Sequence, residues 1–440
     1  MKKEDIYSMY NELDDMINSI DIKKEDIVND DEVVIIEDEE IELNEVANND
    51  VVNDIEVFDD SVQENIETTS VSEPVKEDSN INEEEKILEI DKTINNKEPE
   101  KKKNENKKSN KKWVITFGIL DVIALICLFL MYGPITYFRN LWVTSAMTTA
   151  THQYLAYVFF NEDSVKEIMD NNTVIESNES TDKDEIDFEV KEPVVYESIY
   201  EEQVLKKDEG NDLYKVIDVE GDGYKGHMIV VYDASRVTLF EAPNINYGGK
   251  QMDTMIKLAD AYVGMNASGF SRRSDGGLTP AGSVIMNGKI IHDNGGTGWG
   301  GGIIGFTNDN VLVLTKSSPQ DAVKMGVRDA VSFGPFLIVN GVPSEFKGNG
   351  GYGIAPRTAI GQRKDGIVLM LVIDGRRPGH SLGVDMVELT NIMLKYGAYN
   401  ASNLDGGGSS SMAVNGEIIN VAGGSGYSGD RYLPNAWIVK

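Results

Sequence analysis

The sequence predicts an α+β domain with a mixed, largely antiparallel sheet and packed helices, preceded by a disordered tail and one transmembrane helix. Three observations lead to this fold class. Short apolar runs recur from Tyr214 to the C-terminus, as expected of a domain with many strands. The pairs Asn287-Gly288, Asn340-Gly341 and Asn415-Gly416 are typical of tight hairpins, which join antiparallel strands. Helical periodicity is confined to a few segments, so helices are expected to be the minor element.

The first hundred residues form an acidic tail. The 440-residue chain has a formal net charge of -33, and the acidic residues are concentrated before residue 100, where aromatic residues are scarce. Such a composition buries too little apolar surface to offset the entropy of ordering, so residues 1–100 are expected to be a disordered cytoplasmic tail. Residues 6–20 can form a short helix on a cytoplasmic partner, although a solvated tail is the simpler interpretation. The acidic balance argues against nonspecific binding of nucleic acid.

A basic segment and an apolar segment follow the tail. Residues 101–112 contain seven lysines, and Trp113–Met131 is apolar apart from Thr116 and Asp121. Because this stretch is long enough to cross a bilayer, residues 113–137 are predicted to be a single transmembrane helix. The preceding lysines place the N-terminus in the cytoplasm and the C-terminal domain outside the cell. The region before the span is too long for a cleaved signal peptide.

The segment 138–212 is expected to connect the membrane to the domain. Within it, Tyr137–Phe160 is compatible with a juxtamembrane helix, whereas Asn161–Lys207 is charged and lacks apolar periodicity, as expected of a stalk. The single cysteine, Cys127, lies in the predicted span, so the domain at 213–440 has no disulfide. This is unlike a secreted animal protein and favours a bacterial cell surface.

Within residues 213–440, continuous apolar runs predict strands and helical spacing predicts helices. The predicted strands are 226–232, 237–242, 282–291, 311–315, 331–339, 367–374 and 413–421, and the predicted helices are 251–262, 319–326 and 384–396. The glycine-rich stretch 294–305 is expected to be a flexible loop. Its Trp299 can stack on a sugar ring or simply plug the loop.

The most informative motif is the segment Asn403–Met412, with the sequence NLDGGGSSSM. It places one carboxylate, three glycines and three hydroxyls after an apolar approach. The glycines allow backbone N–H groups to face an anion or a sugar, the serines add donors and acceptors, and Asp405 can hold a cation or move a proton. Three glycines would start a helix poorly, so a functional loop is favoured over a helix cap. These are the parts of a phosphosugar site.

A second carboxylate, Asp374, ends the apolar run at 367–373, which predicts a strand buried on both faces. The following helix, 384–396, is predicted by the spacing of its apolar residues and by Gly397 at its C-terminal cap. If the two strands that this helix joins are parallel and adjacent, Asp374 and Asp405 share one edge of the sheet. From the residues alone, Asp374 is equally well explained as a turn residue.

Taken together, Arg357–Gly361, the Asp374-Gly375-Arg376 strand end, the helix with Glu388 and the Asp405 loop resemble the phosphodiester glycosidase family. The resemblance runs from about Tyr214 to the C-terminus. Weaker parts of it are 266–270, 280–282, 287–289, 334–335, Arg431 and Asn435. The segment that begins at Asn266 departs from the family pattern, because Ala267 and Ser268 stand where glycines are more usual.

The resemblance implies an extracytoplasmic hydrolase that cleaves a sugar-1-phosphodiester linkage in a surface or wall polysaccharide. It implies four catalytic residues, namely Asp405, Asp374, Arg357 and Glu388. Arg357 would bind the phosphate through its planar guanidinium, and the two aspartates would contact the sugar or activate water. The implied substrate-binding residues are Asn266, Arg376, Gly406, Gly407, Gly408, Ser409, Ser410, Arg431 and Asn435.

Each of these assignments has a plainer alternative. Arg357 can form a structural ion pair, Glu388 can face solvent on its helix, and Asn266 can satisfy a buried turn. The same donors would also serve a non-catalytic surface module that binds a phosphate-linked wall or capsule polymer. In a third interpretation, the protein is a scaffold whose acidic tail is the active part.

Neither a metal nor an organic cofactor is predicted with a clear signature. The four histidines, His152, His227, His292 and His380, lack metal-ligand spacing. Oxygen-rich loops are compatible with a Ca²⁺ ion, but the chain has no EF-hand-like spacing to support one. The expected partners are therefore a phosphate-linked glycan or wall polymer and the membrane, through residues 113–137.

Overall fold

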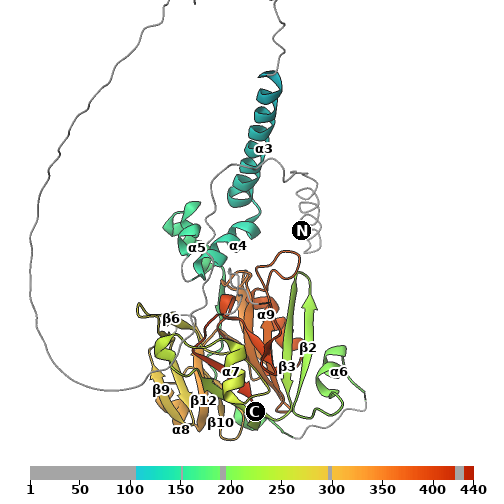
Figure 1. Cartoon of the computed structure of the whole chain (residues 1–440), viewed down its shortest axis with the longest axis vertical. Helices are drawn as coiled ribbons and strands as arrows, with labels where there is room; N and C mark the ends of the chain where they lie inside the picture. Colours follow the sequence, from blue (N-terminus) through green and yellow to red (C-terminus); the bar gives the residue numbers. More distant parts are fainter. Residues whose placement is uncertain (1–105, 150–151, 189–194, 296–299, 422–430) are drawn as a thin grey trace, which may run out of the picture. The chain divides into compact units, whose positions relative to one another are not determined.

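The computed structural model describes residues 106–149, 152–188, 195–295, 300–421 and 431–440 (Figure 1). The chain divides into two units, residues 1–100 and residues 101–440, and all described residues belong to the second. The predicted disordered tail and Trp299 lie outside the described residues.

The largest sheet has seven strands, and every neighbouring pair in it is antiparallel. Across the sheet the strands are β14 (Val342–Pro343), β13 (Phe336–Val339), β18 (Ala398–Asn403), β16 (Arg357–Arg363), β17 (Val368–Ile373), β3 (Tyr224–Val231) and β2 (Tyr214–Gly221). The predicted α+β class with largely antiparallel pairing is confirmed.

Strand β17 explains why this sheet lies in the middle of the domain. All six of its residues are fully buried. Val368, Met370 and Val372 join one hydrophobic core, whereas Leu369, Leu371 and Ile373 join a second core on the opposite face. Burying an aliphatic side chain of this size stabilises a fold by roughly 1.5–3 kcal/mol. The apolar run therefore predicts the two-sided burial correctly, within an antiparallel rather than a parallel sheet.

Two five-stranded sheets pack their apolar residues into the first of these cores. One has the order β11 (Leu312–Thr315), β10 (Gly302–Thr307), β12 (Val327–Phe333), β8 (Ser283–Met286) and β9 (Lys289–Asp293). The other has the order β20 (Glu417–Ile418), β19 (Met412–Val414), β5 (Val263–Asn266), β21 (Asn435–Val439) and β4 (Val237–Glu241). Two short ribbons pair β1 (Thr173–Ile175) with β15 (Glu345–Lys347), and β6 (Phe270–Arg272) with β7 (Leu278–Pro280).

The three helices predicted in the domain are present, each slightly shorter than its predicted range. They are α7 (Met252–Ala259), α8 (Pro319–Lys324) and α9 (Met386–Lys395). Helix α9 packs its apolar stripe on the second core of the large sheet (Figure 1). The carboxylate of Asp385 accepts from the backbone N–H of Glu388 and so caps its N-terminus. Gly397, with φ +82°, follows its C-terminus as predicted.

All three Asn-Gly pairs form turns with positive φ at both residues, as type I′ hairpins require. Asn287-Gly288 divides the run predicted as one strand at 282–291 into the hairpin of β8 and β9. The run 331–339 is likewise two strands, because β12 and β13 belong to different sheets and Gly334-Pro335 separates them. The stretch 294–305 is not wholly a loop, since β10 begins at Gly302.

One helix among the described residues is long and apolar enough to cross a membrane. Helix α3 (Asn106–Tyr132) contains the stretch Trp113–Tyr132, with a mean hydropathy of 2.7. The helix ends earlier than the predicted boundary at residue 137, because Gly133 and Pro134 follow it. Helix α4 (Thr136–Met147) comes next, so the predicted juxtamembrane helix at 137–160 ends at Met147, and only the 3₁₀ turn Gln153–Val158 follows.

The expectation of a stalk at 161–207 is wrong for its described part. Helix α5 (Glu162–Asp170) precedes β1, which pairs with the domain strand β15. The carboxylate of Glu176 accepts from the backbone N–H groups of Gly301 and Phe336, at 2.9 and 3.1 Å. Thr181 exchanges hydrogen bonds with Leu314 of β11. Polar side chains therefore add to the apolar contacts of this segment, in which α5 buries Val165 and Ile168. Helix α6 (Ile199–Leu205) follows and buries Val204 and Leu205.

If the segment around Glu176 is integral to the domain, Glu176→Ala should lower the free energy of unfolding by about 1–3 kcal/mol, because two backbone N–H groups lose their acceptor. Urea unfolding of the detergent-solubilised full-length protein measures this change. Glu179→Ala is the matched control, since that side chain is exposed. Equal stability of the two variants would restore the stalk interpretation.

Candidate active site

Three strands of the large sheet bring the sequence motifs together. Strand β16 begins at Arg357, which pairs with Ile373 at the end of β17, and Ala359 of β16 pairs with Asn403 at the end of β18. Because β16 is antiparallel to both neighbours, β17 and β18 run parallel to each other. Asp374 and Asp405 therefore leave the sheet at the same edge, as the sequence predicts, but they are not on adjacent strands because β16 lies between them.

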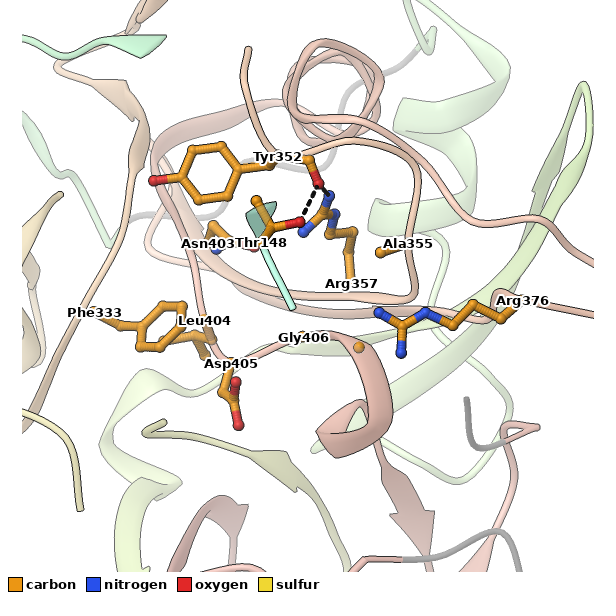
Figure 2. Close-up of a pocket in the computed structure, with 11 residues that line it drawn as sticks. Thr148, Phe333, Tyr352, Ala355, Arg357, Arg376, Asn403, Leu404, Asp405 and Gly406 are labelled. Atoms are coloured by element: carbon orange, nitrogen blue, oxygen red, sulfur yellow. Dashed lines mark hydrogen bonds between the residues drawn. The ribbon is translucent and has the colours of Figure 1, made fainter. Parts of the chain in front are cut away.

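A small cavity of about 90 Å³ opens at this edge (Figure 2). Its walls come from the start of β16, the end of β18, the glycine loop and the residue that follows α4. The lining residues are Thr148, Phe333, Tyr352, Ala355, Arg357, Arg376, Asn403, Leu404, Asp405, Gly406 and Gly407. The cavity is thus lined by five of the predicted site residues, Arg357, Arg376, Asp405, Gly406 and Gly407.

Asp405 is the most perturbed carboxyl group at this edge. Desolvation of its carboxylate raises the pKa of Asp405 from the ordinary value of 3.8 to about 6. A hydrogen bond from Ser409, the nearby charge of Arg431 and the backbone N–H of Gly406 oppose this rise in pKa. Asp405 therefore titrates close to neutrality, as a group that exchanges a proton must.

The side chain of Asn266 holds the Asp405 loop in place. Its Nδ2 donates to the carbonyl of Asp405 at 2.6 Å, while its Oδ1 accepts from the backbone N–H of Ser411 and from the hydroxyl of Thr358, at 3.1 and 2.9 Å. Asn266 is 1% exposed. These contacts favour the plainer of the two expectations for Asn266, in which it satisfies a buried turn.

Most backbone N–H groups of the glycine-serine loop are already used within the protein. Gly407 donates to the carbonyl of Pro356, Ser409 to that of Gly406, and Ser410 to that of Gly407. The hydroxyls are engaged too, since Ser410 bonds to Thr358 at 3.2 Å and Ser409 accepts from Arg431 at 3.2 Å. The three glycines consequently serve close packing, and the loop is not an open cradle of N–H donors as the sequence suggests.

Arg357 binds the protein backbone. Its Nε donates to the carbonyl of Val384 at 3.1 Å, and its Nη2 donates to the carbonyls of Tyr352 and Gly353 at 2.7 Å each. Burial lowers the pKa of Arg357 to about 10, against an opposing effect of the Asp385 carboxylate. The guanidinium thus clamps the loop at 352–353 to the start of α9. This leaves Nη1 as its group on the cavity side and makes a bidentate phosphate contact through the other nitrogens impossible.

Two other arginines flank the glycine loop. A Cβ placed on Gly407 would lie 3.3 Å from Nη2 of Arg376, and one placed on Gly408 would lie 3.0 Å from Nη2 of Arg431. Burial of its guanidinium and the proximity of Arg431 both lower the pKa of Arg376. Figure 2 shows Arg376 and Asp405 on opposite sides of Gly406. Two cations and one carboxyl group therefore meet at one short loop.

The backbone of Arg376 is strained. Its φ is +58°, a left-handed conformation that a long side chain rarely adopts. The turn is held by the bond from Arg376 N–H to the carbonyl of Leu382 and by the bridge between Arg377 and Ser381. Strain of this kind costs about 1–3 kcal/mol and is concentrated at functional sites.

Asp374 points to a separate polar cluster. Its Oδ2 is 2.8 Å from Nε2 of His380, and its Oδ1 accepts from the backbone N–H of Val421 at 2.9 Å and from Nδ2 of Asn420 at 3.3 Å. Asn420 also donates to the carbonyl of Ser410 at 3.1 Å. Asp374 is 1% exposed. The two aspartates are thus connected through Asn420, but Asp374 does not line the cavity.

Two predicted residues lie away from this cavity. Glu388 accepts from the hydroxyl of Tyr224 at 3.2 Å and lies 3.7 Å from the amine of Lys395, on the helix side of the large sheet. Asn435 is fully buried on β21, where its Oδ1 accepts from the backbone N–H of Ser268 at 2.9 Å. Within the described part of the chain, Nδ2 of Asn435 and Oγ of Ser268 have no hydrogen-bond partner.

The structure adds residues that the sequence does not single out. Asn403 lines the cavity, is 3% exposed, and donates through Nδ2 to the carbonyl of Gly334 at 2.7 Å. Its Oδ1 has no partner among the described residues. Thr148 and Tyr352 also line the cavity, and His380 pairs with Asp374. Of these residues, only Asn403 has a sequence signal that indicates a place in the site. It lies at the end of an apolar strand, two residues before Asp405.

No group of three or more His, Cys, Asp or Glu residues in the described ranges is arranged to hold a metal ion.

Residues 259–440 match the model of the phosphodiester glycosidase family. This matching stretch contains Arg357, Arg376, Asp405 and Arg431.

Curated relatives show the same similarity. The chain is 31% identical over 184 residues to the SPbeta prophage-derived uncharacterized protein YomE of Bacillus subtilis, which covers 40% of this chain and 28% of that protein. It is 26% identical over 242 residues to mouse N-acetylglucosamine-1-phosphodiester alpha-N-acetylglucosaminidase, which covers 50% of this chain and 44% of that enzyme. The chain thus spans less than half the length of these relatives.

Among solved structures, the chain is similar to the catalytic domain of the zebrafish N-acetylglucosamine-1-phosphodiester alpha-N-acetylglucosaminidase, auto-inhibited by its pro-peptide. It aligns with 53% of this chain and 86% of its own, at 20% identity and a TM-score of 0.43.

The raised pKa of Asp405 predicts a specific effect on stability. Because the folded state disfavours the carboxylate, the wild-type protein loses stability as the pH rises through about 6. Asp405→Asn removes this charge, so at pH 7 it should raise the free energy of unfolding by about 1–3 kcal/mol.

Urea unfolding between pH 4 and 8 tests this prediction. The gain in stability should be small at pH 4 and reach a plateau above pH 7. Asp309→Asn, at an exposed position, is the control and should leave the unfolding free energy unchanged. A variant at position 405 that is destabilised at pH 7 would show that the carboxylate is favoured in the fold.

Proposed function

We propose that this protein is a hydrolase that cleaves the bond between a sugar's anomeric carbon and a phosphodiester. The observation that carries this proposal is the position of Asp405, whose pKa is raised to about 6, on a loop flanked by Arg376 and Arg431. A carboxyl group that titrates near neutrality beside two cations suits a reaction in which a sugar and a phosphate separate. The match of residues 259–440 to the family model supports the same reaction class.

In this proposal, Arg376 and Arg431 bind the phosphate group of the substrate. Their guanidinium groups lie beside consecutive glycines, and the pKa of Arg376 is lowered by burial first and by the charge of Arg431 second. A phosphodiester between them would neutralise the repulsion between the two charges and accept hydrogen bonds from both. Arg357 acts differently, because its bonds to three backbone carbonyls position the loop that walls the cavity.

Asp405 acts as the group that activates water or stabilises charge on the sugar. A phosphate diester is already a good leaving group, so proton donation to it matters less than in ordinary glycosidases. The harder task is to support positive charge on the sugar ring and to deliver a nucleophile. An ionised Asp405 at neutral pH meets this need, and a pKa of about 6 makes it a stronger base than an ordinary aspartate.

Asn403 contributes to recognition of the sugar. Its amide orientation is set by the bond to the carbonyl of Gly334, and its buried Oδ1 has no partner among the described residues although Asn403 lines the cavity. Leaving a buried acceptor without a partner costs about 1–3 kcal/mol of stability. A hydrogen bond from a hydroxyl or amide N–H of the sugar to this oxygen would recover that free energy.

The protein acts from the membrane in this proposal. Helix α3 supplies the span, and the lysines at 101–112 favour a cytoplasmic N-terminus and an extracytoplasmic domain. The substrate is then a phosphate-linked glycan or wall polymer at the cell surface.

Turnover of a synthetic N-acetylglucosamine-1-phosphodiester by the full-length protein tests the reaction. Asp405→Asn should lower kcat/KM by about 10²–10⁴-fold, the usual contribution of a positioned base. In the wild-type protein, kcat/KM should rise with pH and level off above about 6, because Asp405 must be ionised. Activity that instead falls as the pH rises through 6 would make Asp405 the general acid.

Arg376→Gly separates strain from function. Glycine adopts a φ of +58° without steric cost, so the free energy of unfolding of this variant should be higher than that of the wild type by about 0.5–1 kcal/mol. Turnover should nevertheless fall by at least about tenfold, because one phosphate contact is lost. Asp260→Gly, at a φ of +51° after α7, is the control that relieves strain without affecting turnover.

Retained activity in Arg376→Gly would remove this arginine from the phosphate site. Binding of a phosphate-linked polymer without any turnover by the wild-type protein would favour the alternative function, a non-catalytic surface module.

A further inference from the structure

The segment after the apolar helix is tied to the loop that walls the site. The loop at 348–353 carries four glycines with positive φ. The Nδ2 of Asn349 donates to the hydroxyl of Thr144 on α4 at 2.9 Å. A Cβ on Gly353 would lie only 2.3 Å from the hydroxyl of Ser145, so a side chain there would collide with α4. This loop is therefore shaped to fit α4.

Asn172, just after α5, holds the same loop from its other end. Its Oδ1 accepts from the backbone N–H of Asn349 at 3.1 Å, and its Nδ2 donates to the carbonyl of Ile168 at 2.8 Å. Gly348 and Gly351 approach Asn172 so closely that a Cβ would lie 2.0 and 2.3 Å from its oxygen atoms. The membrane-proximal segment and the loop thus form one packed unit.

The carbonyl of Tyr352 connects this unit to the site arginine. It accepts from the hydroxyl of Thr148 at 3.3 Å and from Nη2 of Arg357 at 2.7 Å (Figure 2). Thr148 and Tyr352 both line the site cavity and also line a second, larger cavity of about 400 Å³. The second cavity therefore borders the site cavity, and it lies between the segment after α4 and the loop at 350–352.

We infer that this second cavity is a subsite for the group esterified to the far side of the phosphate, and that this group is a neutral glycan or polyol. This inference rests on the proposed function. A volume of about 400 Å³ lies within the range of roughly 300–1,000 Å³ that small-molecule sites occupy. The site cavity alone, at about 90 Å³, has no room for a second group.

The lining of the cavity carries the chemical assignment. The hydroxyls of Thr148 and Thr173, the carboxylate of Asp170 and the backbone of the glycine loop offer donors and acceptors for hydroxyl groups. Met147, Met169 and the ring of Tyr352 are the apolar groups among its described lining residues, too few to enclose a polyprenyl chain. The carboxylate of Asp170 is paired with the amine of Lys166 at 2.6 Å, so this ion pair adds no net positive charge that would favour a further phosphate. Hydroxyl-rich, uncharged groups fit these constraints.

Two phosphodiesters of N-acetylglucosamine test this inference with the full-length protein, one esterified to methanol and one to a neutral disaccharide. The disaccharide ester should show a kcat/KM at least about tenfold higher, because only it fills the subsite. Met169→Trp, which fills the cavity, should reduce this preference about tenfold. Glu167→Trp, on an exposed face of the same helix, is the control and should leave the preference unchanged.

A second variant covers the case in which tryptophan disturbs folding. The side chain of Asp170 is 64% exposed, so Asp170→Ala should fold, and it should weaken binding of the disaccharide ester more than binding of the methyl ester. Calorimetry with both esters measures this difference.

The outcomes separate the inference from the proposed function. Equal kcat/KM values for the two esters, or equal loss with both in Met169→Trp, would overturn the subsite. Preference for a polyprenyl ester over the disaccharide ester would overturn the assignment to a glycan or polyol. If neither ester is cleaved, the proposed function fails, and calorimetry still decides the subsite: binding weakened by Met169→Trp and not by Glu167→Trp supports it, and unchanged binding overturns it.

Discussion

The site depends above all on the buried amide of Asn266. Its three side-chain bonds fix the carbonyl of Asp405, the backbone of Ser411 and the hydroxyl of Thr358, and so attach the glycine loop to β5 and β16 at once. Asn266 thus fixes the backbone of the residue whose carboxyl group is desolvated and has its pKa raised to about 6.

The arginines at this edge divide into two kinds. Arg357 is enclosed by backbone carbonyls, where its charge is balanced by dipoles and its main contribution is to hold loop 352–353 against the start of α9. Arg376 and Arg431 lie on the glycine loop and repel each other, and Arg376 does so from a strained backbone. Unfavourable electrostatics and backbone strain at the same place indicate a region shaped for a ligand rather than for stability.

The segment after helix α3 extends this organisation beyond the part of the chain that matches the family model. Residues 172–176 contribute β1, the carboxylate of Glu176 and the side chain of Asn172 to the packing of loops that border the site. These polar contacts join residues far apart in the sequence, and each is worth about 0.5–1.5 kcal/mol. The part of the chain that leaves the apolar helix is thus structurally continuous with the candidate active site.

The sequence by itself determined the fold class, the apolar helix, the three Asn-Gly hairpins and the shared edge of Asp374 and Asp405, because these features follow from local periodicity and turn chemistry. It also indicated the Asp405 loop, since three glycines next to a carboxylate have little use in a core. Only the tertiary structure decided that β16 separates β17 from β18 and that Glu388 contacts Tyr224 and Lys395. It also decided that the guanidinium of Arg357 donates its hydrogen bonds to backbone carbonyls. The partners of Glu176, Asn403 and Thr148 were likewise invisible, because a polar side chain carries no record of the distant backbone group that it will bind.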